Sequence, residues 1–482
     1  MFLEGELLDE LPTSKAVWLQ TLPNPVPPGK TGNLMIMLRR DLANFELPLE
    51  VGVETGSGQS LEARVEDIND PIQLAGIYFS SDLDEIYVYL ENTSEYEITP
   101  ENVYLDSQNA SDRTDFFSAQ VPPKEKGFLR ITPSAPLRQG EYISVRVESS
   151  AGEAAQAVVR AWSHFPITSW DGDTREELHF DPEPFHLSYD PDMEEEELEE
   201  LPGSSAWYLM GCPNCRDRDR GKPLGNAGNA LIEKARKARE IDPSRPSHTH
   251  ICDASKERTY FLYGEACDIM FINPYEVVFR SADPAKNGHY AALAKLACRP
   301  RPLMTIPEAF EMTNEGWLFP SPEQLRLGVY YQLAEGVKGV SYYVKSHYER
   351  YPELEAEIGR VNEELRAARD YLKVGEPFGK LAASSDPKVS ANAIVCADKG
   401  LAVILINTDY ETATEDGKRH TDYRPREGFH VEIEVPAWLE IDRGREIGAG
   451  INATGIHRED GGKITVPMEE LDLTGILLFT SK

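Results

Sequence analysis

The chain has 482 residues, and its 82 acidic against 49 basic side chains give a formal charge of −33. Phosphate groups are bound by clustered Lys and Arg, so this balance argues against nucleic acid and anionic membranes as partners. No apolar run reaches the roughly 18 residues that a membrane span needs. The acidic N-terminal residues lack the basic and apolar parts of a signal peptide. We expect a secreted or periplasmic protein whose signal peptide is absent from this sequence, with a cytoplasmic location as the alternative.

Residues 14–160 have the pattern of short strands separated by turn clusters rich in Gly and Pro. In Ile86–Leu90 and Ile143–Val147, β-branched and aromatic residues dominate, the second with strict alternation. The segments with this character are 16–22, 33–39, 47–54, 76–80, 85–91, 102–106, 127–132, 142–148 and 155–162. Many short strands without a helical pattern predict an N-terminal immunoglobulin-like β-sandwich over residues 13–160.

The pattern changes at Trp162, after which apolar runs alternate with helical segments. The runs are 164–170, 206–211, 248–252, 268–273, 302–307 and 339–343, and helices are expected over 227–240, after Ser321-Pro322-Glu323-Gln324, and around Leu354–Ala368. This alternation predicts a parallel sheet with right-handed crossovers. We expect a TIM (β/α)8 barrel over residues 161–380, either complete or reduced, because six of its strands can be counted in the sequence. A doubly wound sheet is the alternative, although neither a dinucleotide nor a P-loop motif is present.

Beyond Gly379 the helical pattern ends and strands return between polar loops. The predicted strands are 393–397, 401–407, 429–435, 463–466 and 475–481. They indicate a small C-terminal β-sandwich over residues 381–482. The chain is therefore expected to be a multidomain protein with a barrel between two sandwiches.

Three segments in the second half of the predicted barrel have distinctive sequence motifs: Arg301–Phe310, Pro320–Arg326 and Ala334–Tyr343. With the three-domain layout, they resemble the late barrel strands of glycoside hydrolase-like proteins of the Glu/Glu clan related to β-galactosidase. The resemblance implies a (β/α)8 barrel that cleaves glycosidic bonds, with Glu308 where the late-strand glutamate of the family lies. The chain departs from the family because Asn314-Glu315 lies in a loop and Asn362-Glu363 lies within a helix. No Asn-Glu pair therefore ends a fourth strand.

Catalytic groups of barrel enzymes lie at the carboxyl ends of the strands. Glycoside hydrolysis needs two carboxyl groups, one on each side of the scissile bond. Glu308 is the nucleophile candidate, with ligand binding alone as its alternative role. Asp253, then Glu276, then Asp171 are candidates for the partner acid, since each follows a predicted strand. Asp253 also fits a helix N-cap.

Aromatic and polar residues near the predicted strand ends are candidates for sugar contacts. An aromatic ring can stack on the C–H face of a pyranose, although core packing is the alternative for each. The predicted substrate-binding residues are Asp171, Trp207, His250, Asn273, Tyr275, Trp317 and Tyr343. His248 and His250 alternate with Thr249 and so share a face, where we favour buried, hydrogen-bonded imidazoles over a metal pair.

The six cysteines do not form a disulfide framework. Cys212-Pro-Asn-Cys215 is half of a zinc motif, and a local disulfide or two thiols are alternatives, so we assign no metal and no cofactor.

Residues 171–201 contain 14 acidic residues and one arginine. They fit a solvated loop or an acidic rim beside the barrel mouth that disfavours anionic sugars, and Asp171-Gly172-Asp173 could contribute to a Ca²⁺ site if further oxygens converge.

The sequence thus predicts a glycoside hydrolase that acts on a neutral oligo- or polysaccharide by a two-carboxylate mechanism. The alternative is a catalytically inactive glycosidase-like barrel that binds carbohydrate or serves as a surface interaction protein, because a fold alone does not establish activity. Carbohydrate is the expected partner, as substrate or as ligand, and no oligomeric state follows from the sequence.

Overall fold

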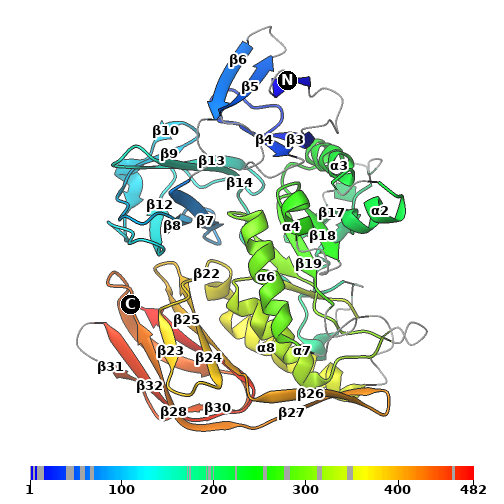
Figure 1. Cartoon of the computed structure of the whole chain (residues 1–482), viewed down its shortest axis with the longest axis vertical. Coiled ribbons are helices and arrows are strands. Elements are labelled where there is room, and N and C mark those ends of the chain that lie inside the picture. The colour runs from blue at the N-terminus through cyan, green and yellow to red at the C-terminus, as the bar shows by residue number, and fades with distance from the viewer. Residues whose placement is uncertain are drawn as a thin grey trace.

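The computed structural model describes residues 2–3, 6–7, 16–38, 48–54, 60–65, 70–170, 172, 175–190, 193, 197–198, 200–222, 225–252, 258–275, 283–311, 317–344, 351–458 and 462–482. In these parts of the chain, a curled parallel sheet with helices on its outer side lies beside two β-sandwiches, which also contact each other (Figure 1). No described helix has the length and hydropathy required to cross a bilayer.

The N-terminal sandwich consists of two four-stranded antiparallel sheets, in the orders β10-β9-β13-β14 and β11-β12-β8-β7. Alternate side chains of both sheets, among them Val88, Leu129 and Val145, fill the space between them. The strands are β7 (Ile72–Phe79), β8 (Ile86–Asn92), β9 (Pro100–Leu105), β10 (Gln108–Asn109), β11 (Thr114–Asp115), β12 (Lys126–Ile131), β13 (Tyr142–Ser149) and β14 (Ala154–Arg160), with the 3-10 turn η2 (Ser111–Arg113). The strands predicted over this stretch are confirmed.

The strands before residue 66 form separate small sheets. These are β1 (Phe2–Leu3), β2 (Glu6–Leu7), β5 (Leu49–Glu54) and β6 (Ser60–Val65) in one sheet, and the hairpin of β3 (Ala16–Leu22) and β4 (Asn33–Leu38). The hairpin packs on the central region, where the Trp18 indole donates to the Leu262 carbonyl at 2.9 Å and the Asn229 amide to the Val17 carbonyl at 3.0 Å. Strands β3 and β4 therefore form a hairpin that contacts helices of the central region and is not part of the sandwich sheets.

The central sheet has seven parallel strands in the order β15-β21-β20-β19-β18-β17-β16. They are β15 (Ile167–Ser169), β16 (His186–Ser188), β17 (Ala206–Gly211), β18 (Ser247–Cys252), β19 (Ile269–Asn273), β20 (Leu303–Thr305) and β21 (Val340–Tyr342). Six of them match the predicted runs, and β16 was missed. The described strands show no pairing between β15 and β16, which follow each other in the chain but occupy opposite edges. Over the described residues the sheet is thus an open, curled part-barrel, and they do not form a closed eight-stranded barrel.

Helices cover the outer face of this sheet: α2 (Pro213–Asp219), α3 (Ala227–Ile241), α4 (Arg258–Tyr263), α6 (Ala285–Cys298), α7 (Pro322–Ala334) and α8 (Pro352–Leu372), with the 3-10 turn η3 (Glu176–Leu178). Helix α7 begins at the predicted capping box. The Ser321 hydroxyl accepts from the Gln324 amide at 3.2 Å, and the Gln324 side chain accepts from the Ser321 amide at 3.0 Å. Helix α8 buries Leu354, Ile358 and Leu365 against the sheet, as its spacing predicts.

The C-terminal sandwich packs the sheet β22-β24-β25-β33-β29 against β23-β28-β32-β30, with β31 paired to β32. The strands are β22 (Glu376–Pro377), β23 (Ala382–Ser384), β24 (Val389–Cys396), β25 (Gly400–Asn407), β28 (Arg426–Glu434), β29 (Ile441–Ile447), β30 (Ile451–Ala453), β31 (His457–Arg458), β32 (Lys463–Leu471) and β33 (Thr474–Ser481). The five strands predicted here are confirmed. A long hairpin, β26 (Tyr410–Glu415) and β27 (Lys418–Tyr423), leaves the sandwich and runs beside α7 (Figure 1).

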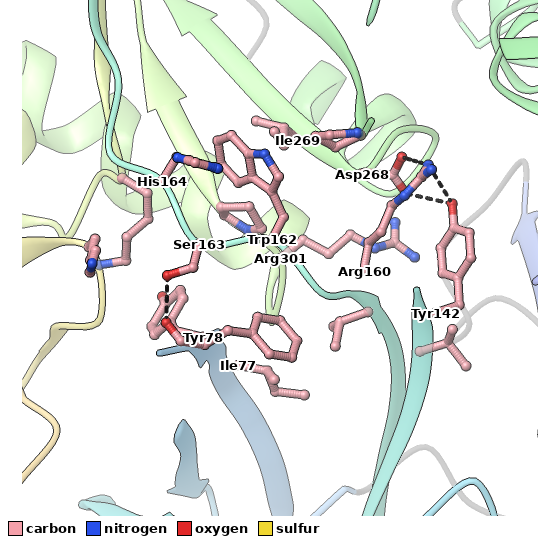
Figure 2. Close-up of a pocket in the computed structure, with 17 residues that line it drawn as sticks. Ile77, Tyr78, Tyr142, Arg160, Trp162, Ser163, His164, Asp268, Ile269 and Arg301 are labelled. Carbon is pink, nitrogen blue, oxygen red and sulfur yellow. Dashed lines mark hydrogen bonds and ion pairs between the residues drawn. The ribbon is translucent and has the colours of Figure 1, made fainter. Parts of the chain in front are cut away.

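The N-terminal sandwich meets the amino-terminal ends of the parallel strands through a buried polar cluster. Asp268, which directly precedes β19, accepts from Arg160 at 3.0 Å and from the Tyr142 hydroxyl at 2.7 Å, and these side chains converge in Figure 2. The Ser247 amide donates to the same carboxylate at 2.8 Å. Asp268 therefore lies at the amino-terminal end of the sheet, away from the carboxyl ends of the strands where barrel enzymes keep their catalytic groups.

A second buried cluster joins all three regions at Glu376 on β22. Its carboxylate accepts from the Tyr78 hydroxyl at 2.8 Å and from Lys126 at 2.9 Å, both in the N-terminal sandwich, and lies 3.0 Å from Lys295 on α6. Burial alone would raise the pKa of Glu376, but the positive charges of the surrounding lysines lower it to about 2. The Glu376 carboxylate therefore connects the two sandwiches and the central region, because it interacts with side chains from each of them.

Candidate functional site

Glu308 lies at the carboxyl edge of the central sheet, just beyond β20. It forms an isolated parallel bridge with Tyr343, which follows β21, and the Tyr343 amide donates to the Pro307 carbonyl at 3.3 Å. The Glu308 residue is 7% exposed. The backbone pairing thus fixes a largely buried carboxylate at the edge where barrel enzymes carry their catalytic groups.

Three predicted sugar-contacting residues lie together beside Glu308, around a ring that was not predicted. Phe310 has its ring centroid 4.9 Å from that of Tyr343, 5.0 Å from that of Tyr275 and 6.2 Å from that of Trp317. All three neighbours of Phe310 are half-buried, so each ring keeps some access to solvent. We call Glu308, Tyr275, Phe310, Trp317 and Tyr343 the Glu308 mouth.

The C-terminal sandwich also contributes a residue near the Glu308 mouth. Arg419 on the β26–β27 hairpin is half-buried, and burial lowers the pKa of its guanidinium while the negative charge of Glu308 opposes that shift. The hairpin is held to the central region by the Thr421 and Ser321 hydroxyls, whose oxygens are 2.9 Å apart. Sequence reasoning missed Arg419 because nothing in the polar strand Lys418–Tyr423 indicates a contact with another domain.

The other predicted site residues are not part of the Glu308 mouth as the structure describes it. Asn273 ends β19, is 4% exposed, and pairs in register with Cys252 on the next strand. Trp207 is 1% exposed and packs in the core between the sheet and its helices, away from the Glu308 mouth. The three predicted partner acids, Asp171, Asp253 and Glu276, lie outside the described residues.

The interior of the curled sheet holds a stack of histidines. The Nδ1 atom of His186 lies 3.2 Å from Nε2 of His248, and the Trp170 ring centroid lies 4.0 Å from that of His186 and 5.0 Å from that of His250. His248 and His250 do share one face, as their alternation predicts. Burial lowers the pKa of His186 to about 3 and that of His250 to about 4, so these imidazoles are neutral at neutral pH.

Three cysteines meet at the carboxyl ends of β17 and β18. Cys212 forms a disulfide with Cys252, with Cα atoms 5.4 Å apart, and the sulfur of Cys215 lies 2.9 Å from that of Cys252. The Nε2 atom of His250 is 3.0 Å from the Cys212 sulfur. The disulfide thus connects two neighbouring strands, and the local pairing considered within Cys212-Pro-Asn-Cys215 is wrong.

The described part of the acidic segment 171–201 is not a continuous rim beside the Glu308 mouth. Asp181 bonds to the Ile167 amide at 2.9 Å and to Arg369 at 2.5 Å, so it lies at the amino end of β15. Glu183 precedes β16 and accepts from the Ser204 hydroxyl at 2.7 Å. For these two residues the prediction of an acidic rim at the carboxyl edge is wrong, because the strands start where the acids lie. Asp171 and Asp173, considered for Ca²⁺, lie outside the described residues.

No protein family model and no curated protein matches the chain. Several solved structures that are similar to it are enzymes of carbohydrates. A cycloisomaltooligosaccharide glucanotransferase from Paenibacillus sp. is 8% identical over 84% of this chain and 100% of that chain, with a TM-score of 0.42. A GH2 β-galacturonidase from Eisenbergiella tayi is 10% identical (64% and 74% covered, TM-score 0.25), and a β-glucuronidase from Bacteroides uniformis is 9% identical (86% and 82% covered, TM-score 0.26). At these TM-scores we base the function on the residue geometry alone.

Proposed function

We propose that the protein is glycosidase-like, that the Glu308 mouth binds a neutral oligo- or polysaccharide, and that Glu308 is a catalytic carboxylate in its hydrolysis. The observation that supports this most is the combination of a largely buried strand-end carboxylate with three half-buried aromatic rings. Aromatic faces contact the C–H face of a sugar, and a carboxylate accepts hydrogen bonds from its hydroxyls. Both kinds of group are within one small area of the sheet edge.

In this proposal Glu308 acts as the ionised carboxylate of a pair. It either attacks the anomeric carbon or activates water, depending on its distance from the second carboxyl group. The positive charge of Arg419 stabilises the negative charge of Glu308. The second carboxyl group is proposed to be Asp253, then Glu276, then Asp171, since each follows a strand of the same sheet.

A second candidate is carbohydrate binding without hydrolysis. It is favoured by the interaction between Arg419 and Glu308, because a carboxylate that neighbours an arginine can serve as a fixed structural ion. The next carboxylate along the chain, Glu311, is also engaged, accepting from the Tyr351 hydroxyl at 3.2 Å. In this case the Glu308 mouth would hold a sugar without cleaving it.

A panel of chromogenic aryl glycosides of both anomeric series separates the two candidates. Hydrolysis by the wild type that falls by about 1,000-fold or more in Glu308→Gln, with binding of the sugar retained, supports catalysis by Glu308. Glu265→Gln is the matched control, because Glu265 is a carboxyl at the opposite end of the sheet, next to β19. Hydrolysis that is unaffected by Glu308→Gln contradicts the catalytic role. Sugar binding without hydrolysis, weakened in Trp317→Ala, supports the second candidate.

A further inference from the structure

We propose that Cys212, Cys215 and Cys252, in their reduced form, bind a thiophilic divalent metal ion of the Zn²⁺ class at the carboxyl edge of the central sheet. The ligand atoms of these three residues all lie within 4.8 Å of one another. Zinc–sulfur bonds of about 2.3 Å place tetrahedrally arranged sulfurs about 3.8 Å apart, so a single ion can contact all three after small side-chain movements.

The backbone brings the three sulfurs together from three elements. Cys212 follows β17 in a left-handed conformation with φ of 45°, and it caps α2, which carries Cys215. Cys252 ends the neighbouring strand β18. The Cys212 amide donates to the His250 carbonyl at 3.0 Å, and the Asn214 side chain donates to the Cys252 carbonyl at 2.6 Å. The bend after β17 therefore directs both sulfurs of the C-x-x-C segment towards the end of β18.

A disulfide accounts for only two of the three cysteines. The Cys212–Cys252 bridge leaves unexplained why a third sulfur, that of Cys215, is placed 2.9 Å from Cys252. A single metal ion could bind all three sulfurs as thiolates. Thiolate ligands favour Zn²⁺ and related soft ions. The disulfide and the metal site are alternative states of the same residues, since a bridged sulfur is no longer a thiolate.

His250 is positioned to supply the fourth ligand. Its Nε2 atom lies 3.0 Å from the Cys212 sulfur, and it stands two residues before Cys252 on the same face of β18. Its buried Nδ1 atom has no hydrogen-bond partner among the residues that the structure describes, so the ring can turn about its χ angles without losing a bond to them. Three thiolates and one imidazole form the Cys3His set found in structural zinc sites.

Cobalt uptake by the whole protein tests this site. The protein is reduced with a phosphine, stripped with a chelator, and titrated with Co²⁺ under anaerobic conditions. We expect one Co²⁺ per chain, with the sulfur-to-cobalt charge-transfer bands of a tetrahedral thiolate site, and displacement of Co²⁺ by Zn²⁺. Cys215→Ser and Cys252→Ser should lose these bands, and His250→Ala should keep charge-transfer bands while binding more weakly. Cys396→Ala is the matched control, because Cys396 is a buried cysteine on β24.

Circular dichroism of each protein establishes that it is folded before the titration. The proposal is overturned if reduced, folded wild type takes up no Co²⁺, or if Cys215→Ser binds Co²⁺ as the wild type does. Cys215 is the most informative position, because it is partly exposed and outside the disulfide, so that its replacement by Ser should preserve the fold. Loss of the bands in the Cys396→Ala control would also overturn the proposal.

Discussion

The Nε2 atom of His186 lies 2.6 Å from the Ser341 hydroxyl oxygen, which connects β16 to β21 across the interior of the curled sheet. These strands are not neighbours: β16 is one edge of the sheet, and β21 is next to the other edge, β15. A side-chain hydrogen bond therefore spans the region where the described strands show no backbone pairing. It helps to hold the sheet in its curled form, which places the carboxyl ends of its strands on one side.

Ser341→Ala removes this connection and is expected to destabilise the central region. Ser341 is fully buried, and its loss leaves a buried imidazole nitrogen of His186 without its partner, which costs about 1–3 kcal/mol. A lower melting temperature, followed by near-ultraviolet circular dichroism of the Trp170 and histidine stack, is the expected result. Ser60→Ala, at an exposed position on β6, should change the melting temperature little. Equal melting temperatures for Ser341→Ala and wild type would show that the bond does not hold the sheet.

Asp268→Asn is expected to remove a part of the free energy of unfolding that depends on pH between about 4 and 2. Burial would raise the pKa of Asp268, but Arg160, Arg239 and the bonds from Ser247 and Tyr142 lower it to about 2. Since the unfolded pKa is about 3.9, the stabilisation of about 2–3 kcal/mol is present above pH ~4 and is lost as the pH falls towards 2.

The melting temperature of wild type should therefore fall from pH 4 to pH 2 more steeply than that of Asp268→Asn. The variant itself should be less stable by about 3–5 kcal/mol at neutral pH, because it leaves Arg160 buried without its counter-charge. Asp112→Asn, whose side chain is 83% exposed, is the control. The same slope in Asp268→Asn and wild type would contradict the lowered pKa.

Lys338→Met tests whether the pKa of the buried Lys338 is lowered in the folded protein. Burial and the charge of Lys295 lower the pKa of Lys338 to about 7, and its ammonium donates to the Leu372 carbonyl at 3.1 Å. The unfolded chain keeps its proton up to a pKa of about 10.4, so the stability of the wild type relative to Lys338→Met should rise by about 1.4 kcal/mol per pH unit between pH ~7 and ~10. Thermal unfolding at pH 7, 8 and 9 measures this difference. A difference that stays constant with pH would show that Lys338 titrates normally.

Trp317→Ala is expected to weaken sugar binding without a large effect on the fold. The half-buried indole lies at the edge of the Glu308 mouth, and loss of one stacking surface costs about 0.5–1.5 kcal/mol, or up to about tenfold in affinity. Calorimetric titration with an oligosaccharide bound by the wild type measures the change. Tyr96→Ala, at a 50% exposed position on the N-terminal sandwich, is the matched control. If both variants lost the same sugar affinity, Trp317 would not be part of the binding site.

Much of the fold could be predicted because its elements have strong local patterns. The six long apolar runs of the central sheet and the capping box of α7 coincide with the observed elements. Strand β16 was missed because His186-Leu187-Ser188 contains one apolar residue, Leu187, and lies between acidic segments. Helix α6 was missed because its apolar residues, most of them Ala, do not define a clear apolar face.

The candidate site was predictable where a residue follows a strand or, as Trp317 does, lies in the loop beyond it. Glu308, Tyr275 and Tyr343 were placed at the sheet edge by the rule for parallel strands, and they do lie there. The approach of Arg419 and the convergence of Cys252 with Cys212 depend on packing between distant segments. No local pattern of residues indicates such contacts, so they appear only in the structure.

The most direct measurement is a crystal structure of Glu308→Gln soaked with an oligosaccharide that the panel identifies as a ligand. The proposed function predicts a sugar ring in the Glu308 mouth, stacked on Tyr275, Trp317 or Tyr343, with a hydroxyl or the anomeric carbon directed at the residue 308 side chain. A sugar bound elsewhere on the protein, with the Glu308 mouth unchanged, would contradict it.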